Sequence, residues 1–518
     1  MKWLRAARPA RIARIAIAAT VLCGVTFGIL DVANPGAGLA LRVVASWQLF
    51  PAVGRAIATG TLALGAAALL VLLLSLVFGR WYCAALCPLG TLQDLASLPR
   101  RNRRGFARPR TAMRVLALVL VLGAAAIGAA GLASWLDPWS LFGRFAAYDL
   151  QSVLRLAARE DLPGLVPSTV LASGAAVAAI LAASFASGRW FCGNLCPVGS
   201  TLGLLNSLAP LRLRLDSGEC IACGECASVC RASCVDSAAK RLDPSRCVYC
   251  LACLEVCPTG ALYYGRPRPA PSAPASSRIS RARFLAALGG GAAALMVALV
   301  PGRAFASKAL GVRATGLGAP FPVLPPGARS LERFVGTCVA CGACISVCPS
   351  RVLQPSLGQL GLIGLMAPRL DHGVSYCQYD CIACIDACPS GALGRMGLER
   401  KRLTKIGDAT LVRDRCIVIT NLTKCGACAE CCPTGAVRMV AAGDGLPEPV
   451  FTSSICIGCG ACHHACPVRP DRAISVSGLA VQALAEPPST KLFDQGPSVP
   501  AAGGAGTAKG AVKDAFPF

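Results

Sequence analysis

Long apolar segments alternate with short basic segments along the first 190 residues. The apolar segments cover residues 15–30, 57–78, 115–136 and 166–187, and none has a charged residue in its middle. An α-helix needs about 20 apolar residues to cross a bilayer, so the last three are long enough and the first is short. The pattern predicts an α-helical membrane domain with four spans.

Basic residues concentrate at particular ends of these predicted spans. Residues 1–14 are basic, and residues 100–114 contain seven arginines, whereas the loops at 31–55 and 137–168 are less basic. Cytoplasmic loops of membrane proteins carry an excess of Lys and Arg. We therefore expect a cytoplasmic N-terminus, with the ends of the second and fourth spans on the cytoplasmic side.

A further apolar segment follows a linker in the middle of the chain. Residues 266–306 contain a Pro-, Ser- and Arg-rich stretch, typical of an extended connection, and then the apolar segment 284–300. Arg281 and Arg283 resemble a twin-arginine export signal with an alanine between the two arginines, and Ala306 ends a small-x-small cleavage pattern. An ordinary fifth membrane helix is the alternative. Both interpretations put the remainder of the chain on the far side of the membrane.

The composition agrees with a membrane protein. Of the 518 residues 54% are hydrophobic, and the mean hydropathy is +0.58, which is too apolar for a soluble protein. The net charge of +25 could indicate nucleic-acid binding, but residues 1–306 hold 31 Lys and Arg against 12 Asp and Glu, around the apolar segments. This distribution favours lipid, and not nucleic acid, as the partner of the basic residues.

Twenty-four of the 31 cysteines form six sets with the spacing of iron–sulfur ligands. Bacterial [4Fe–4S] sites use three thiolates on one C-x2-C-x2-C loop and a fourth cysteine that is usually followed by proline. Residues 216–265 hold the sets Cys220, Cys223, Cys226, Cys230 and Cys247, Cys250, Cys253, Cys257. Residues 307–485 hold the sets Cys338, Cys341, Cys344, Cys348; Cys377, Cys381, Cys384, Cys388; Cys416, Cys425, Cys428, Cys432; and Cys456, Cys459, Cys462, Cys466.

These sets predict α+β bacterial-ferredoxin-like cluster domains on both sides of the membrane, followed by a disordered tail at 486–518. In two-cluster domains the fourth cysteine of one set binds the neighbouring cluster. The rule joins Cys257 to the Cys220 loop and Cys230 to the Cys247 loop, although Arg231 stands where proline is usual. Ligand sharing among the four later sets stays open. Zinc is the alternative metal, but zinc sites seldom use triple-cysteine loops closed by C-x3-C-P.

A twelve-residue pattern recurs after the second and fourth apolar segments. Residues 79–90 read GRWYCAALCPLG, and residues 188–199 read GRWFCGNLCPVG. The membrane domain, residues 1–215, thus contains two duplicated units, each with one C-x3-C-P motif. Their four thiols are candidates for a further metal or cluster, for a dithiol–disulfide pair, or for docking a cluster domain, with simple packing as the remaining alternative: Cys83, Cys87, Cys192 and Cys196.

The duplicated C-x3-C-P motifs and the two-cluster domain after them resemble NapH-type membrane ferredoxins. The part after Ser280, with four cluster sets, resembles NapG/MauM-type exported polyferredoxins, so the chain looks like a fusion of the two. The resemblance implies an electron-transfer component of a quinol dehydrogenase in the bacterial inner membrane, with a periplasmic C-terminal ferredoxin domain. It would pass single electrons from the quinone pool through six [4Fe–4S] clusters to a periplasmic redox protein or reductase, such as that for nitrate.

Two other functions fit the same residues. The chain could serve the maturation or regulation of a metal centre, or it could export electrons from a cytoplasmic ferredoxin. No nucleotide, flavin or molybdenum site is predicted, because the sequence has neither a Gly-rich phosphate loop in a strand-to-helix context nor a P-loop. The chain is therefore predicted to relay electrons, with no residue that catalyses a reaction on the final substrate.

Overall fold

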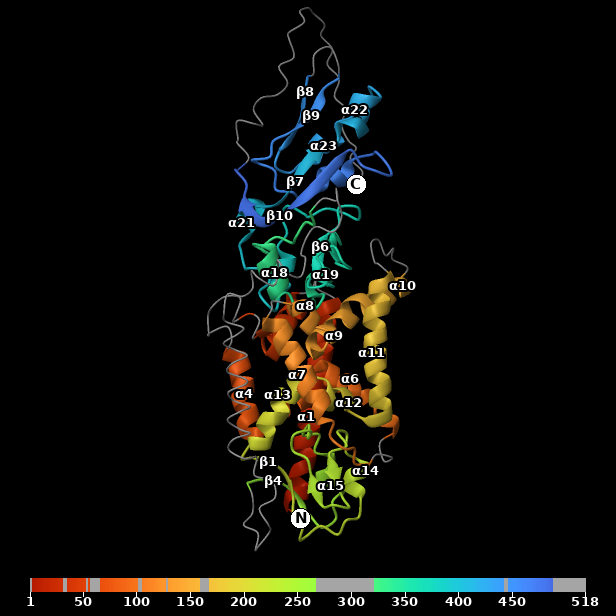
Figure 1. The fold of residues 1–518 in the computed structure, drawn as a ribbon, viewed down its shortest axis with the longest axis vertical. Helices are drawn as coiled ribbons and strands as arrows, with labels where there is room; N and C mark the ends of the chain where they lie inside the picture. Colours follow the sequence, from red (N-terminus) through yellow and green to blue (C-terminus); the bar gives the residue numbers. More distant parts are fainter. Residues whose placement is uncertain are drawn as a thin grey trace, which may run out of the picture.

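The computed structural model describes residues 2–30, 35–52, 55, 66–100, 105–126, 129–158, 167–266, 321–441 and 446–487. They form a helical part, residues 2–208, with a cysteine-rich part at each of its two opposite ends (Figure 1). We call these the N-terminal ferredoxin part, residues 212–266, and the C-terminal ferredoxin part, residues 321–487. The predicted fifth apolar segment and nearly all of the predicted tail lie outside the described residues.

The helical part consists of long apolar helices and short helices between them. Its elements are α1 (Lys2–Leu30), α2 (Pro35–Ser46), α4 (Ala66–Phe78), α5 (Trp81–Ala85), α6 (Pro88–Ala96), η2 (Leu98–Arg100), α7 (Thr111–Ala126), α8 (Ala130–Ala133), α9 (Pro138–Arg144), the π-helix η3 (Phe145–Leu150), α10 (Gln151–Ala157), α11 (Pro167–Ser187), α12 (Trp190–Asn194) and α13 (Pro197–Leu208). Within the described residues, two segments are long and apolar enough to cross a membrane, Arg8–Leu30 of α1 and the whole of α11; α4 and α7 are apolar but shorter.

The predicted third span is not one continuous helix. Helix α7 ends at Ala126, and the separate helices α8 and α9 follow. The chain approaches the C-terminal ferredoxin part here, since a Cβ atom on Gly131 would lie 2.5 Å from the Ile363 carbonyl oxygen. The segments predicted as loops also contain helices, and every residue of α9 is buried. Apolar residues in this region therefore pack against another part of the protein, which hydropathy alone does not distinguish from lipid contact.

The N-terminal ferredoxin part pairs its first and last strands around two cysteine loops. Strand β1 (Arg212–Leu215) runs antiparallel to β4 (Leu262–Gly265), and β2 (Val235–Asp236) pairs with β3 (Arg241–Leu242). The short helices α14 (Glu225–Ser228) and α15 (Ala252–Val256) follow the two loops. Cysteines contribute much of the buried core of this part.

The C-terminal ferredoxin part repeats this arrangement. Its elements are α18 (Leu331–Thr337), α19 (Ala343–Ser346), β5 (Leu353–Pro355), β6 (Pro368–Leu370), α20 (Ala383–Ala387), α21 (Leu398–Arg402), β7 (Thr404–Leu411), η4 (Arg413–Arg415), α22 (Ile417–Thr420), α23 (Ala427–Glu430), β8 (Val437–Val440), β9 (Glu448–Phe451), α24 (Ala461–Ala465) and β10 (Ile474–Leu484). The antiparallel pairs are β5–β6, β7–β10 and β8–β9. The last two cysteine sets lie in the sequence between β7 and β10.

Glycines allow a close approach between the helical part and a cysteine loop at each end. Gly79 has φ +85°, and a Cβ atom there would overlap the ring of Tyr249, which lies between Cys247 and Cys250. At the opposite end, a Cβ atom on Gly143 would lie 2.5 Å from the Cys341 carbonyl oxygen. Larger residues at these two positions would push the cysteine loops away from the helices.

Candidate iron–sulfur sites

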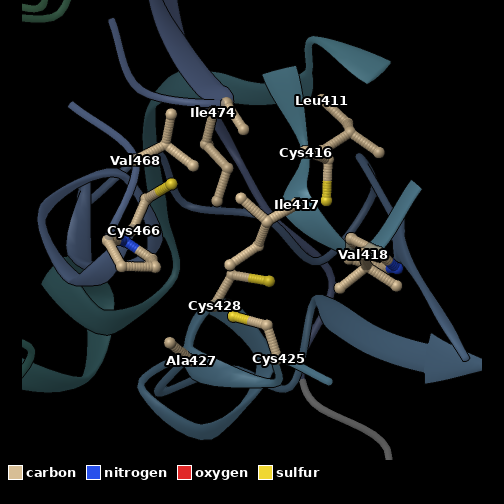
Figure 2. Close-up of a pocket in the computed structure, with 13 residues that line it drawn as sticks. Leu411, Cys416, Ile417, Val418, Cys425, Ala427, Cys428, Cys466, Val468 and Ile474 are labelled. Atoms are coloured by element: carbon tan, nitrogen blue, oxygen red, sulfur yellow. The ribbon is translucent and has the colours of Figure 1, made fainter. Parts of the chain in front are cut away.

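Four cysteines from two different sets line one small apolar cavity in the C-terminal ferredoxin part (Figure 2). Cys416, Cys425 and Cys428 come from one set, and the fourth thiol is that of Cys466, from the next set along the chain. Conversely, Cys462 lies within electrostatic range of its own loop and of both Cys431 and Cys432, and Cys459 of the same loop is also within range of Cys432. The fourth cysteines of these two sets are thus exchanged.

The same exchange occurs between the other two sets of this part. Cys348 lines a cavity with Cys377, Cys381 and Cys384, although it follows the Cys338 loop in sequence. Cys388 in turn lies within electrostatic range of the thiols of the Cys338 loop. The sequence left the pairing of the four sets open, and the structure pairs neighbours in sequence.

The N-terminal ferredoxin part has the crossed arrangement that the spacing predicts. Cys226 interacts electrostatically with Cys220, Cys223 and Cys257. Cys253 interacts with Cys247, Cys250 and Cys230 in the same way. Each group again combines one loop with the fourth cysteine of the other set.

The backbone of the last loop, from Cys456 to Cys462, explains how its three thiols can point to one centre. Gly458 and Gly460, between the ligands of the last loop, have φ +72° and +81°, in the left-handed region that suits glycine. These residues fold the chain tightly before α24 begins. Backbone amides also donate to the thiols, as from Ala340 to Cys338 Sγ at 3.4 Å. Such hydrogen bonds stabilise a negatively charged cluster and tune its reduction potential.

The donor chemistry fits iron–sulfur clusters. Four thiols around an apolar cavity are the ligand set of a [4Fe–4S] cluster. Among the residues that the structure describes, no group of three or more Cys, His, Asp or Glu side chains is placed to hold one metal ion. A four-iron cluster is larger than one ion, so the thiolates that bind it lie farther apart than the ligands of a single ion.

The two C-x3-C-P motifs meet in the helical part. Their thiols form what we call the four-thiol site, in which each cysteine lies within electrostatic range of the other three and is at most 5% exposed: Cys83, Cys87, Cys192 and Cys196. Cys87 Sγ accepts a hydrogen bond from the Gly90 amide at 3.4 Å and so caps α6. Cys196 Sγ caps α13 by accepting from the Gly199 amide at 3.2 Å.

The arginine of each repeat reaches into the other repeat. Arg189 donates to the Cys83 carbonyl oxygen, and its Nε lies 2.7 Å from Asp94 Oδ1. Arg80 donates to the Cys192 carbonyl oxygen at 3.4 Å, and its Nη2 lies 3.7 Å from Cys83 Sγ. Both guanidinium groups are buried. Neither arginine was predicted as a site residue from the sequence, although both occupy the same place in the two copies.

Asp94 is the buried counter-ion of three arginines. It pairs with Arg189, Arg231 and Arg14, and its side chain is 7% exposed. Burial by itself would raise the pKa of Asp94, but the positive charges of the three arginines lower it. The carboxylate is therefore ionised at neutral pH. Arg231, the residue in place of the usual proline, thus links the N-terminal ferredoxin part to the repeat.

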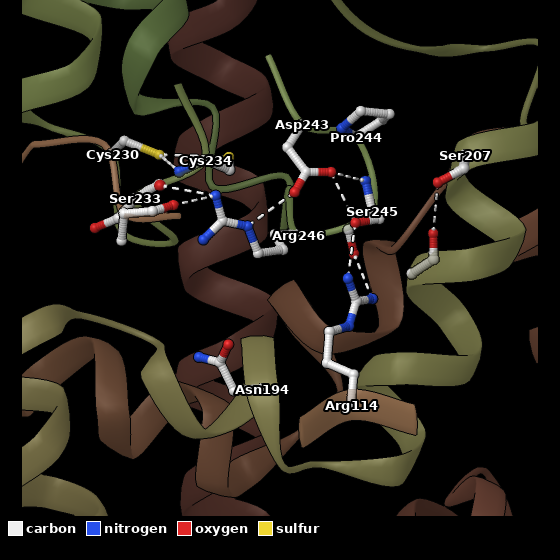
Figure 3. Close-up of polar contacts among 12 residues, drawn as sticks. Arg114, Asn194, Ser207, Cys230, Ser233, Cys234, Asp243, Pro244, Ser245 and Arg246 are labelled. Carbon is white, nitrogen blue, oxygen red and sulfur yellow. Dashed lines mark hydrogen bonds and ion pairs between the residues drawn. The ribbon is translucent and has the colours of Figure 1, made fainter. Parts of the chain in front are cut away.

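Polar contacts fix the N-terminal ferredoxin part on the helices (Figure 3). Arg114 of α7 donates to Ser245 Oγ at 2.8 Å, and Ser245 Oγ donates to Asp243 Oδ1 at 2.7 Å. Arg246 Nε donates to Asp243 Oδ2 at 2.9 Å. This network lies directly before Cys247, so it holds the second cysteine loop against the helical part.

Comparison with known proteins identifies iron–sulfur domains in the same segments. Residues 59–106 and 169–215 match a 4Fe-4S binding domain, and 240–263 match another 4Fe-4S binding domain. Residues 337–393 and 423–469 each match a 4Fe-4S dicluster domain. The chain contains ferredoxin-type 4Fe-4S domains. The two dicluster matches agree with the pairing of neighbouring sets seen in the C-terminal ferredoxin part.

Several ferredoxin-type proteins are similar to parts of the chain. "Ferredoxin-type protein NapH" of Escherichia coli (strain K12) is 29% identical over 178 residues, which are 33% of this chain and 54% of NapH. "Ferredoxin-type protein NapF" of the same strain is 29% identical over 138 residues, 26% of this chain and 75% of NapF. "Methylamine utilization ferredoxin-type protein MauM" of Methylorubrum extorquens is 32% identical over 147 residues, 26% of this chain and 63% of MauM.

The chain thus spans about half the length of NapH and larger shares of NapF and MauM. No solved structure matches it. The similarities support the predicted resemblance to NapH-type and MauM-type proteins. Together with the two apolar helices of spanning length, the similarity to NapH indicates association with a membrane.

Proposed function

We propose that this protein carries single electrons across a bacterial inner membrane, from quinol to a periplasmic redox protein or reductase. The observation that carries the proposal is the placement of cysteine sets at opposite ends of apolar helices (Figure 1). Clusters at both ends suit a relay, because each cluster takes and gives one electron without binding a substrate. The proposal includes a fusion of a NapH-type unit with an exported NapG/MauM-type unit, and a nitrate-reductase type of system as acceptor.

Six [4Fe–4S] clusters are proposed to bind at the crossed cysteine groups. In this proposal one loop and the fourth cysteine of the neighbouring set bind each cluster, and the cavities and electrostatic contacts between these cysteines support it. When bound, such clusters supply one-electron oxidation and reduction. The chain's own residues contribute thiolates, exclude water with apolar side chains, and donate backbone hydrogen bonds to the sulfur atoms.

The proposed topology has four spans, a fifth span or export signal, and a cytoplasmic N-terminus. It is supported by α1 and α11, which have spanning length, and by the basic residues of segment 105–114, where the Ala107 amide donates to the Ser233 carbonyl oxygen of the N-terminal ferredoxin part. The C-terminal ferredoxin part is then periplasmic.

A cavity beside the N-terminal ferredoxin part supports quinol as the electron donor. Its volume is about 450 Å³, within the range of ligand pockets, and its lining is mainly apolar and aromatic. Ile17 and Phe78, which are 49% and 45% exposed, lie on two apolar helices at its wall, so a lipid-soluble molecule has access. Leu251, between the ligands Cys250 and Cys253, also lines it. Oxidation of one quinol there would release two protons and two electrons, which the adjacent cluster accepts one at a time.

Ala13→Trp tests this site, since Ala13 lines the cavity and is exposed, so the larger side chain fills the cavity without overpacking the core. We expect quinol-driven cluster reduction to slow about tenfold or more, equivalent to a loss of at least about 1.4 kcal/mol of binding, while reduction by dithionite is unchanged. The measurement is anaerobic mixing with a quinol analogue, followed by EPR of the reduced clusters.

Ala16→Trp is the matched control, because Ala16 is exposed on the same helix and is not among the cavity residues. Equal rates for the two variants would contradict the assignment of the cavity. Failure of quinol to reduce the unmodified protein would contradict the proposed donor itself.

A further inference from the structure

We infer that the four-thiol site binds a seventh [4Fe–4S] cluster, which connects the clusters of the two ferredoxin parts. Its ligands are the cysteines of both C-x3-C-P motifs: Cys83, Cys87, Cys192 and Cys196. Only the role of this cluster in electron flow rests on the proposed function. Its binding can be tested without a donor or an acceptor.

The four-thiol site has the number of thiols that a [4Fe–4S] cluster needs. Four buried thiols come together from two segments 109 residues apart in sequence, and each of the two motifs contributes a pair. The match of both repeat segments to a 4Fe-4S binding domain agrees with this donor set, although each segment alone has only two cysteines. Two half-sites therefore make one complete set of four ligands.

Arg80 places a buried positive charge beside the four-thiol site. Its side chain is fully buried, and among the described residues no carboxylate pairs with it. Its partners are the carbonyl oxygens of Ser245 and Cys192 and the thiol of Cys83, and its Nε has no hydrogen-bond partner. A buried charge without a counter-ion is costly. A cluster held by four thiolates is an anion, so it would supply the counter-charge that the protein side chains do not.

The uncharged side chain of Gln93 also donates a hydrogen bond to the four-thiol site. Its Nε2 donates to Cys192 Sγ at 3.2 Å, and the residue is fully buried. The two helix-capping amides, from Gly90 and Gly199, donate to the remaining thiols Cys87 and Cys196. Hydrogen bonds to all of these sulfur atoms are the type of interaction that stabilises a reduced, more negative cluster.

The four-thiol site has contacts toward both ferredoxin parts. It belongs to the same buried core as Cys341, a proposed ligand in the C-terminal ferredoxin part. Toward the other end, Ala84 packs in the core of the N-terminal ferredoxin part, and Arg80 donates to the Ser245 carbonyl oxygen, two residues before Cys247. The site thus lies between the two groups of clusters. The sequence has no histidine before His372 that could bind a haem there.

Each transfer through the site involves one electron. With clusters bound, the one at the Cys247 loop would be oxidised as the one at the four-thiol site is reduced, and the latter would be oxidised in turn as the one at the Cys338 loop is reduced. No bond forms or breaks and no proton moves.

The double variant Cys87→Ser/Cys196→Ser tests the inference. Serine is a good helix N-cap, so α6 and α13 keep their caps while two thiolate ligands are lost. We expect iron to fall from about 28 to about 24 atoms per chain, with the EPR signals of the other six clusters retained. In vesicles, electron transfer from external dithionite to enclosed ferricyanide should fall to the rate without protein.

Cys23→Ser is the matched control, since Cys23 is an exposed cysteine of α1, and it should leave iron and transfer unchanged. The unmodified protein gives a second measurement that needs no variant. About 28 irons per chain supports the seventh cluster, and about 24 overturns it. An unchanged iron content in the double serine variant overturns it as well.

Discussion

Replacing Cys416 and Cys466 together by alanine is expected to remove one cluster, with a loss of about four irons per chain. The reason is the exchange of fourth ligands, which puts Cys466 in the cavity of the Cys416 loop (Figure 2). If each set instead closed its own cluster, the same two substitutions would damage two clusters and remove about eight irons. Iron and acid-labile sulfide, determined on protein purified without oxygen, distinguish the two outcomes.

The reciprocal double variant, Cys416→Ala/Cys432→Ala, provides the matched control. Cys432 lies near the thiols of the Cys456 loop, so this pair is expected to damage two clusters although both cysteines belong to one set in sequence. A loss of about four irons here and about eight in the first variant would reverse the assignment. Both variants remove two cysteines from the same region, so a general loss of folding affects them equally.

Asp94→Asn is expected to lower the free energy of unfolding by about 3–5 kcal/mol. The carboxylate faces Arg189, Arg231 and Arg14, and removing it leaves the buried guanidinium of Arg189, whose side chain is 0% exposed, without its carboxylate partner. The substitution keeps the shape of the side chain, so the loss reports charge more than packing. Denaturant unfolding in detergent, followed by circular dichroism of the helices, measures the difference.

Asp471→Asn is the control for this prediction. Asp471 is 74% exposed and lies 3.8 Å from Arg415, a surface pair expected to contribute about 1 kcal/mol or less. A similar effect of the two substitutions would contradict a structural role for the buried network around Asp94.

The cysteine sets could be predicted from sequence because their spacing reflects the local shape of a ligand loop. The crossed pairing in the N-terminal ferredoxin part followed from the same rule, and the structure agrees with it. Pairing among the four later sets could not be predicted, since it depends on which loops the strand pairs bring together. The β7–β10 pair, for example, joins residues about 70 positions apart around the Cys416 and Cys456 loops.

The helical part was predicted less completely. Hydropathy identifies α1 and α11, but it cannot distinguish lipid contact from contact with the C-terminal ferredoxin part. The predicted third span, residues 115–136, therefore continues past Ala126, where α7 ends. The contacts that Arg80 and Arg189 make with the opposite repeat were also not predicted. The signal was present, because a charged residue at the same place in both copies, directly after an apolar segment, indicates a specific buried partner.

Electron transfer across a sealed bilayer tests the central claim most directly. The protein is reconstituted without oxygen into vesicles that enclose ferricyanide, and dithionite is added outside. We predict that the enclosed ferricyanide is bleached much faster than in vesicles without protein, because the clusters form a continuous path between the two ferredoxin parts. Bleaching at the rate of protein-free vesicles, while EPR shows the externally accessible clusters to be reduced, would contradict the relay.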